Sequence, residues 1–320
     1  MPLATSGAAV NTGKRWPGCW FTGPSGKRWG LESLKGSKTV KTVAVVTDSA
    51  ANLSRQLAEE WDIEVIPLWI QMDDESLRDG VDIQPLEFFR RLTEKPYRLR
   101  TSQPPLGEFL QVYQRLKERA QAIISIHVTS RYSGTFQAAR AAAAELVPFP
   151  IEVVDSGTLA MAQGFVVLAA AQAAAAGASL AEVVRRAKGA ISKVDLVATL
   201  ETLEYVVRGG RLAWAARLVG NLLNTRPIVQ VRENTLGLIG QARTRAQAIR
   251  KLLDALSERA GDARVRIAVL HTGAIEEAMQ LKEEIAARFR CVEVLVEPVT
   301  PVLGVHAGPG ALGLACYMEG

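Results

Sequence analysis

Short apolar runs alternate with segments of helical periodicity along the first half of the chain. The apolar runs are rich in Val and Ile, and they predict strands at residues 42–46, 64–70, 122–128 and 151–154. Between them the apolar positions recur every three or four residues, as at Leu53, Leu57 and Trp61, which predicts helices. Because the strands are apolar on both faces, we expect a mostly parallel sheet with helices on both sides.

The second half carries a different pattern. Helices are predicted over residues 245–260 and 275–288, and the runs 227–231 and 236–240 are typical of a β-hairpin. The segment 301–311 contains three glycines and two prolines around His306, so we expect a rigid, exposed turn there. A hairpin among further strands and helices is typical of an α/β domain with a mixed sheet.

This change of pattern divides the chain into three parts. Residues 1–40 show no apolar period, and we expect a disordered tail or a misassigned start. One α/β domain is predicted over residues 41–185 and a second over 186–320. The run 159–178 has no charge, but it is rich in Ala and contains two glutamines and two glycines. This weak hydrophobicity favours a buried helix over a membrane span.

Composition excludes several classes of protein. The formal net charge is +5, but residues 1–42 carry +6, so the rest of the chain has no general attraction to nucleic acid. Cys19, Cys291 and Cys316 form no Cys-x-x-Cys pair, so we expect reduced thiols in a cytoplasmic protein. The histidines have no neighbouring carboxylates at metal-ligand spacing, and we expect neither a metal nor a cofactor.

Four loops rich in hydroxyl groups are candidates for a ligand site. They lie at residues 47–49, 101–103, 129–135 and 155–157. Ligands of open α/β sheets bind at the carboxyl ends of the strands, although Ser and Thr also cap helices. Ser133-Gly134-Thr135 is more specific than the others, because it joins a predicted strand to a predicted helix. The N–H groups at such a helix N-terminus favour a carboxylate or a phosphate.

Two other functions remain open at this point. A serine hydrolase would use Ser133 as the nucleophile and His306 as the base. The surrounding residues lack the Gly-x-Ser-x-Gly turn of many such enzymes, since they are Arg131-Tyr132-Ser133-Gly134-Thr135. The other alternative is a sensor or carrier of a different organic acid.

An ordered set of short motifs resembles the DegV family of bacterial fatty-acid-binding proteins. The set begins near Lys41 and continues to the C-terminus. The motifs are Val46-Thr47-Asp48-Ser49, Thr101-Ser102-Gln103-Pro104, Ser133-Gly134-Thr135, Val154-Asp155-Ser156, Arg208-Gly209-Gly210-Arg211, Pro227-Ile228, Ala242-Arg243-Thr244 and His306-Ala307-Gly308-Pro309-Gly310. No single motif is sufficient to indicate the family, so the resemblance rests on the order of the whole set.

The resemblance implies a fold, a ligand and site residues. It implies two α/β domains that hold a long-chain fatty acid, such as palmitate, between them. By position, Thr101, Ser133 and His306 resemble the residues that bind the carboxylate. Arg243 resembles a family arginine that serves the head group or its phosphorylated form. The family presents its ligand to a separate fatty-acid kinase, so the resemblance implies a lipid-binding protein rather than an enzyme.

Overall fold

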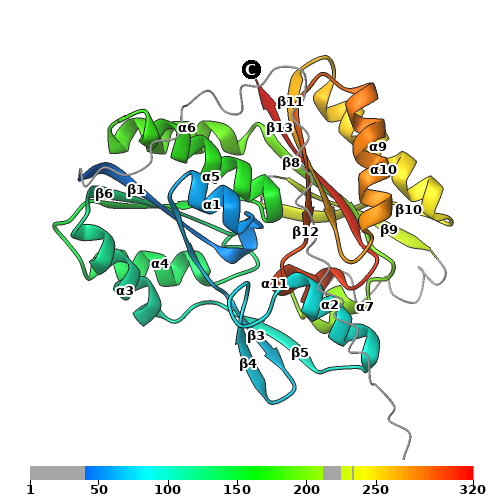
Figure 1. The fold of residues 1–320 in the computed structure, drawn as a ribbon, viewed down its shortest axis with the longest axis horizontal. Helices are drawn as coiled ribbons and strands as arrows, with labels where there is room; N and C mark the ends of the chain where they lie inside the picture. The colour runs from blue at the N-terminus through cyan, green and yellow to red at the C-terminus, as the bar shows by residue number, and fades with distance from the viewer. Residues whose placement is uncertain (1–39, 212–224, 233, 320) are drawn as a thin grey trace, which may run out of the picture. The chain divides into compact units, whose positions relative to one another are not determined.

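A computed structural model describes residues 40–211, 225–232 and 234–319 (Figure 1). The predicted disordered tail or misassigned start, except for Val40, lies outside the described residues. Contacts join the described residues into one compact unit. The division into domains at residues 185 and 186 stays a prediction.

The first sheet is fully parallel, as predicted. Its strand order is β2-β1-β6-β7. The strands are β1 (Lys41–Asp48), β2 (Ile63–Ile66), β6 (Ala120–His127) and β7 (Ile151–Asp155). Helices α3 (Leu106–Lys117) and α4 (Thr135–Ala144) cover one face, and α5 (Ala160–Ala175) and α6 (Leu180–Ile191) cover the other (Figure 1). Apolar strands are therefore buried from both sides, which explains the lack of alternation in the sequence.

The strand predicted over residues 64–70 is wrong, because two strands of different sheets occupy this segment. β2 ends at Ile66, and β3 (Trp69–Met72) pairs antiparallel with β4 (Glu75–Arg78) and β5 (Leu99–Ser102). Pro67 stands at the break, and its missing N–H cannot continue a sheet ladder. The small antiparallel sheet that results carries Thr101 on β5.

The third sheet is mixed, in agreement with the predicted fold class. Its order is β10-β9-β8-β13-β11-β12, in which only β11 and β12 run parallel. The strands are β8 (Val194–Thr199), β9 (Arg226–Arg232), β10 (Thr235–Ala242), β11 (Arg264–His271), β12 (Cys291–Pro298) and β13 (Leu312–Glu319). β9 and β10 form the predicted hairpin. Helices α9 (Arg245–Ala260) and α10 (Ile275–Arg288) pack on one face of this sheet.

The exposed turn predicted over residues 301–311 is also wrong, because it begins with the helix α11 (Pro301–Ala307). Pro301 stands in the first helical turn, where its fixed φ angle favours a helix, and Val302 and Val305 are buried. The turn is confined to the residues after Gly308, whose φ of 71° ends the helix. The remaining short elements are the 3₁₀ turn η1 (Ser49–Ala51) and the helices α1 (Arg55–Glu60), α2 (Pro85–Glu94) and α7 (Glu204–Arg208).

Helix α5 is the buried helix predicted from the Ala-rich run. Eleven of its sixteen residues are buried, and it packs against β1 of the parallel sheet and against β8 and β13 of the mixed sheet. Gly164 permits this approach, since a Cβ there would lie 2.8 Å from the Ala51 carbonyl oxygen. No helix within the described ranges has both the length and the apolar character that a membrane span requires.

A buried polar network joins α5 to the parallel sheet. The Asp48 carboxylate accepts hydrogen bonds from the N–H groups of Ala50 and Val128, at 3.0 and 2.9 Å, and lies 2.9 Å from His127 Nδ1. Gln163 of α5 donates to Asp48 and to the Thr47 hydroxyl. Since buried polar groups without partners are costly, this network sets how α5 and the two central strands fit together.

Asp79 holds the start of α11. Its Oδ1 accepts a hydrogen bond of 3.2 Å from the Val302 N–H, in the first turn of that helix. The side chain is buried, and burial raises the pKa of the Asp79 carboxyl to about 7. A proton therefore binds Asp79 more tightly in the folded protein than in the unfolded chain, where an aspartate titrates near pH 4.

Asp79 makes the stability of the fold depend on pH. Between about pH 4 and 7 the folded state holds the extra proton, so the contribution of Asp79 to the free energy of unfolding falls as the pH rises. We expect Asp79→Asn to stabilise the protein increasingly, relative to the wild type, from pH 5 to pH 8. Denaturant unfolding at several pH values measures the difference.

Asp82→Asn is the matched control for this prediction. Its exposed carboxylate pairs with Arg78, whose hydrogen bonds lower the pKa of Asp82 to about 2. The Asp82 carboxylate is ionised in both states above pH 5, so the effect of this substitution should not change between pH 5 and 8. Parallel pH curves for the wild type and Asp79→Asn would contradict the assignment.

Candidate functional site

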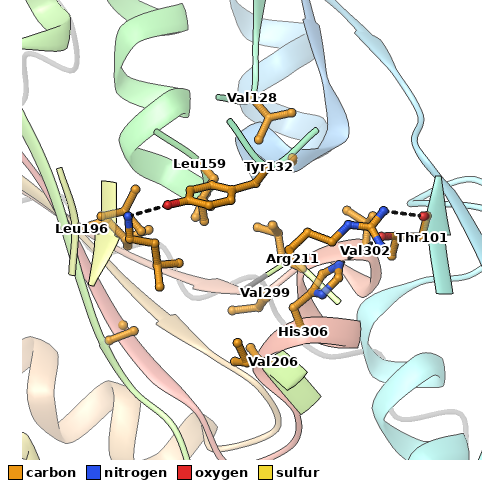
Figure 2. A pocket seen from close by; sticks show the side chains of 18 of the residues that line it. Thr101, Val128, Tyr132, Leu159, Leu196, Val206, Arg211, Val299, Val302 and His306 are labelled. Atoms are coloured by element: carbon orange, nitrogen blue, oxygen red, sulfur yellow. Dashed lines mark hydrogen bonds between the residues drawn. The ribbon is translucent and has the colours of Figure 1, made fainter. Parts of the chain in front are cut away.

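A cavity of about 410 Å³ lies where the loops of the parallel sheet meet the mixed sheet and α11. Its polar and charged lining residues are few: Thr101, Ser102, Gln103, Tyr132, Ser133, Arg211 and His306. The other lining residues are apolar or glycine, and many come from β8, β9, β13 and α11. Figure 2 shows Thr101, Arg211 and His306 together on one side of the cavity, with Leu196 on the other.

Three of the four predicted site residues line this cavity. Thr101 lies on β5, Ser133 precedes α4, and His306 lies in the last turn of α11. The Thr101 hydroxyl is 3.0 Å from His306 Nε2, although the two residues are 205 positions apart in the sequence. Folding therefore brings Thr101 and His306 into contact and places Ser133 in the lining of the same cavity.

Arg211 adds a positive charge beside this pair. Its guanidinium donates to the Thr101 carbonyl oxygen at 2.9 Å (Figure 2). It also donates to the Gly209 carbonyl oxygen at 2.8 Å. The side chain is exposed, so the charge stands at the opening of the cavity. Burial, and then the Arg211 charge, lower the pKa of His306 to about 4. The imidazole is thus neutral at pH 7.

Gly209 makes room for the imidazole. A Cβ at position 209 would overlap the His306 ring at Nδ1 and Cε1. His306 Nδ1 therefore faces a glycine backbone, whereas a serine hydrolase needs an acid at this position to orient its histidine. The Arg-Gly-Gly-Arg motif thus supplies both a close backbone approach and the guanidinium of Arg211.

The Ser133 loop packs against the Thr101 loop. A Cβ at Gly134 would overlap the Gln103 side chain, so the glycine lets Gln103 lie against the start of α4. The Ser133 hydroxyl is 2.8 Å from the Thr135 hydroxyl and accepts a hydrogen bond of 3.3 Å from the Thr135 N–H. Ser133 is thus bonded within its own loop, and His306 is bonded to Thr101.

The apolar part of the cavity is buried. Its wall includes Leu200, Leu203, Val206 and Val229, which are each at most 8% exposed. By contrast, Ser102, Gln103 and Arg211 are exposed, and Thr101, Ser133 and His306 are partly exposed. The cavity therefore combines a polar end that reaches solvent with an apolar end that excludes it.

The other two hydroxyl-rich loops are used within the protein. Thr47 donates to the Ile126 carbonyl oxygen at 2.8 Å, and the Ser49 hydroxyl accepts from the Leu68 N–H. Asp155 accepts from the N–H groups of Ser130 and Gly157. These side chains stabilise the turns after the strands, which is the ordinary role of such residues.

Arg243, the fourth predicted site residue, is not among the residues that line the described cavity. It is exposed after β10, where its N–H donates to Gln247 at the start of α9. The residue patterns did not indicate Arg211 or Tyr132 as site residues, although Arg211 is the last residue of the motif Arg208-Gly209-Gly210-Arg211. Within the ranges that the structure describes, no group of His, Cys, Asp and Glu side chains has the arrangement of a metal site.

Comparisons with known proteins agree with this architecture. The family model described as "Uncharacterised protein, DegV family" matches residues 42–319. A DegV domain-containing protein of Streptomyces coelicolor is 36% identical over 274 residues, which cover 85% of this chain and 97% of the relative. Protein DegV of Bacillus subtilis is 33% identical over 278 residues, or 86% of this chain and 99% of the relative.

Solved structures show the same fold. A fatty-acid-binding DegV family protein from Thermus thermophilus superposes with a TM-score of 0.81 at 31% identity and covers 87% of this chain and 100% of its own. DegV from Bacillus subtilis, described as a fatty acid binding protein, has a TM-score of 0.80 at 32% identity with the same coverage. The family model, the sequence relatives and the shared fold lead to one conclusion: the chain belongs to the DegV family.

Proposed function

We propose that this protein binds a long-chain fatty acid and presents it to a fatty-acid kinase. The observation that carries the proposal is the division of the cavity into a polar end that reaches solvent and a buried apolar end. A fatty acid has the same division between its carboxylate and its acyl chain. The DegV relatives from Thermus thermophilus and Bacillus subtilis are described as binding fatty acids, which supports this ligand class.

The apolar end supplies the driving force. The cavity volume of about 410 Å³ lies within the range of small-molecule sites. Each buried methylene contributes about 0.8 kcal/mol, so the fourteen methylenes of palmitate give about 11 kcal/mol before the cost of ordering the chain. No acidic residue lines the cavity within the described ranges, so its known lining offers no charge repulsion to a carboxylate.

The polar end offers hydrogen-bond donors to the carboxylate. In our proposal the neutral His306 carries its proton on Nε2 and donates to the Thr101 oxygen, 3.0 Å away. The Thr101 hydroxyl then keeps its own proton for the ligand. Ser133 provides a second hydroxyl, and hydrogen bonds from such groups to a charged acceptor are stronger than neutral ones.

Arginine completes the site from two positions. Arg211 lines the cavity opening and compensates the negative charge of the ligand. Arg243 lies outside the described lining, so its proposed contact is with the phosphorylated head group rather than with the buried acid. We propose these two roles for Arg211 and Arg243.

The geometry disfavours a serine hydrolase. His306 Nε2 bonds to Thr101 rather than to Ser133, and Nδ1 faces Gly209. We therefore assign phosphoryl transfer from ATP to the kinase and ligand binding to this chain. In this proposal the protein acts in the cytoplasm, without a cofactor, as a lipid-binding partner of that enzyme.

Ligand identification tests the proposed ligand class. We expect native mass spectrometry of the purified protein to show one bound fatty acid, and an emptied protein to take up added palmitate. The reason is the match between the cavity and an amphipathic acid. A different organic acid in the extract would favour a sensor or carrier of that acid, and an empty protein that ignores palmitate would contradict the proposal.

Removing the hydroxyl groups tests the carboxylate site. The double variant Thr101→Val and Ser133→Ala should bind palmitate at least about a hundredfold more weakly, because each charge-assisted hydrogen bond contributes about 1.5–3 kcal/mol. Titration calorimetry with palmitate measures the loss, and hexadecanol should show a much smaller change because it has no charge.

Ser130→Ala is the matched control. Ser130 is exposed on the same loop as Ser133 but does not line the cavity, so its loss should leave palmitate affinity unchanged. If the double variant bound palmitate as tightly as the wild type, the proposed contacts of Thr101 and Ser133 would be wrong.

A further inference from the structure

Tyr132 is a large side chain that extends across the cavity. It precedes Ser133, so its backbone lies beside the polar end. Figure 2 shows its ring pointing away from Thr101, Arg211 and His306, toward the side of the cavity where Leu196 lies. The ring packs against the apolar cluster that includes Leu200 and Val229. Tyr132 therefore borders the space that an acyl chain would follow from the polar end.

The Tyr132 hydroxyl is already bonded to the far wall. It accepts a hydrogen bond of 2.9 Å from the Leu236 N–H on β10. β10 is an edge strand of the mixed sheet, where alternate N–H groups have no neighbouring strand. Tyrosine hydroxyls that leave water commonly find such a partner. The bond fixes the hydroxyl end of the ring at β10, so Tyr132 forms a wall of the apolar space.

The far wall is itself held in place. The Thr129 hydroxyl donates to Asn234 Oδ1 at 2.7 Å, and the Asn234 N–H donates to the Gly157 carbonyl oxygen at 3.0 Å. Both bonds attach Asn234, two positions before Leu236, to loops of the parallel sheet. The Tyr132 ring is thus anchored at its backbone and at its hydroxyl, so an acyl chain cannot easily displace it.

We propose that the Tyr132 ring limits the length of the acyl chain that the cavity accepts. The inference rests on the proposed function, since it concerns the apolar end of the same site. Replacing Tyr132 with alanine frees the space that the ring now occupies between the polar end and β10. Each further methylene that is buried there favours binding by about fourfold, so a chain longer by two carbons gains about tenfold or more.

The test is a competition among saturated fatty acids of 14, 16, 18 and 20 carbons at equal concentrations, read by native mass spectrometry. We expect Tyr132→Ala to raise the ratio of bound 20-carbon to bound 16-carbon acid at least about tenfold over the wild type. Tyr132→Leu, which keeps more of the packing, should move the ratio in the same direction by a smaller factor. Tyr132→Leu also tests the inference if Tyr132→Ala does not fold.

Tyr132→Phe is the matched control, because it keeps the ring and removes the hydrogen bond to Leu236. The ratio of bound 20-carbon to bound 16-carbon acid in this variant should stay within about twofold of the wild-type ratio. Unchanged ratios in folded Tyr132→Ala and Tyr132→Leu would overturn the inference while leaving fatty-acid binding intact. A wild-type protein that binds none of the four acids would instead overturn the proposed function.

Discussion

Both large sheets depend on the burial of α5, a helix without a polar face. Its residues pack against β1 on one side and against β8 and β13 on the other, and Gly164 allows the helix to approach η1. A helix that is apolar all round needs cover on every side, and the two sheets and α6 supply it. The same packing places Leu159 and Ala160, at the helix start, in the cavity wall. The site is thus built where the shared helix begins.

The polar end of the cavity is held together by hydrogen bonds within the protein. Thr101, Arg211 and His306 come from a small antiparallel sheet, the residues after α7 and the end of α11, and hydrogen bonds join them. Groups that are fixed by the protein in this way add less to the entropy cost of binding than mobile ones. Asp79 supports the position of His306 indirectly, because it holds the first turn of α11, the helix that carries His306. The buried network around Asp48 positions the loop from Val128 toward Ser133 in a comparable way.

Much of the fold could be predicted from residue patterns, because these patterns record burial. The Val- and Ile-rich runs became β1, β6 and β7, and the helices α9 and α10 have the predicted bounds. The patterns failed at two segments, where packing between distant residues decided the local structure. Residues 65–70 are all apolar, and only their partners show that β2 and β3 belong to different sheets. Residues 301–311 contain the glycines and prolines of a turn, yet burial of Val302 and Val305 favours a helix.

The residues alone show which chemical groups the site offers: hydroxyl groups at Thr101 and Ser133, an imidazole at His306, and an apolar run that had to be buried. The family also follows from the residues, through motifs in a fixed order. Which of these groups meet became visible in the folded chain. Folding joined Thr101 to His306, placed Arg211 beside them, left Arg243 exposed and extended the Tyr132 ring to Leu236. Burial follows local residue patterns, whereas contacts across a cavity depend on how separate sheets pack, and for this reason the pattern alone does not predict them.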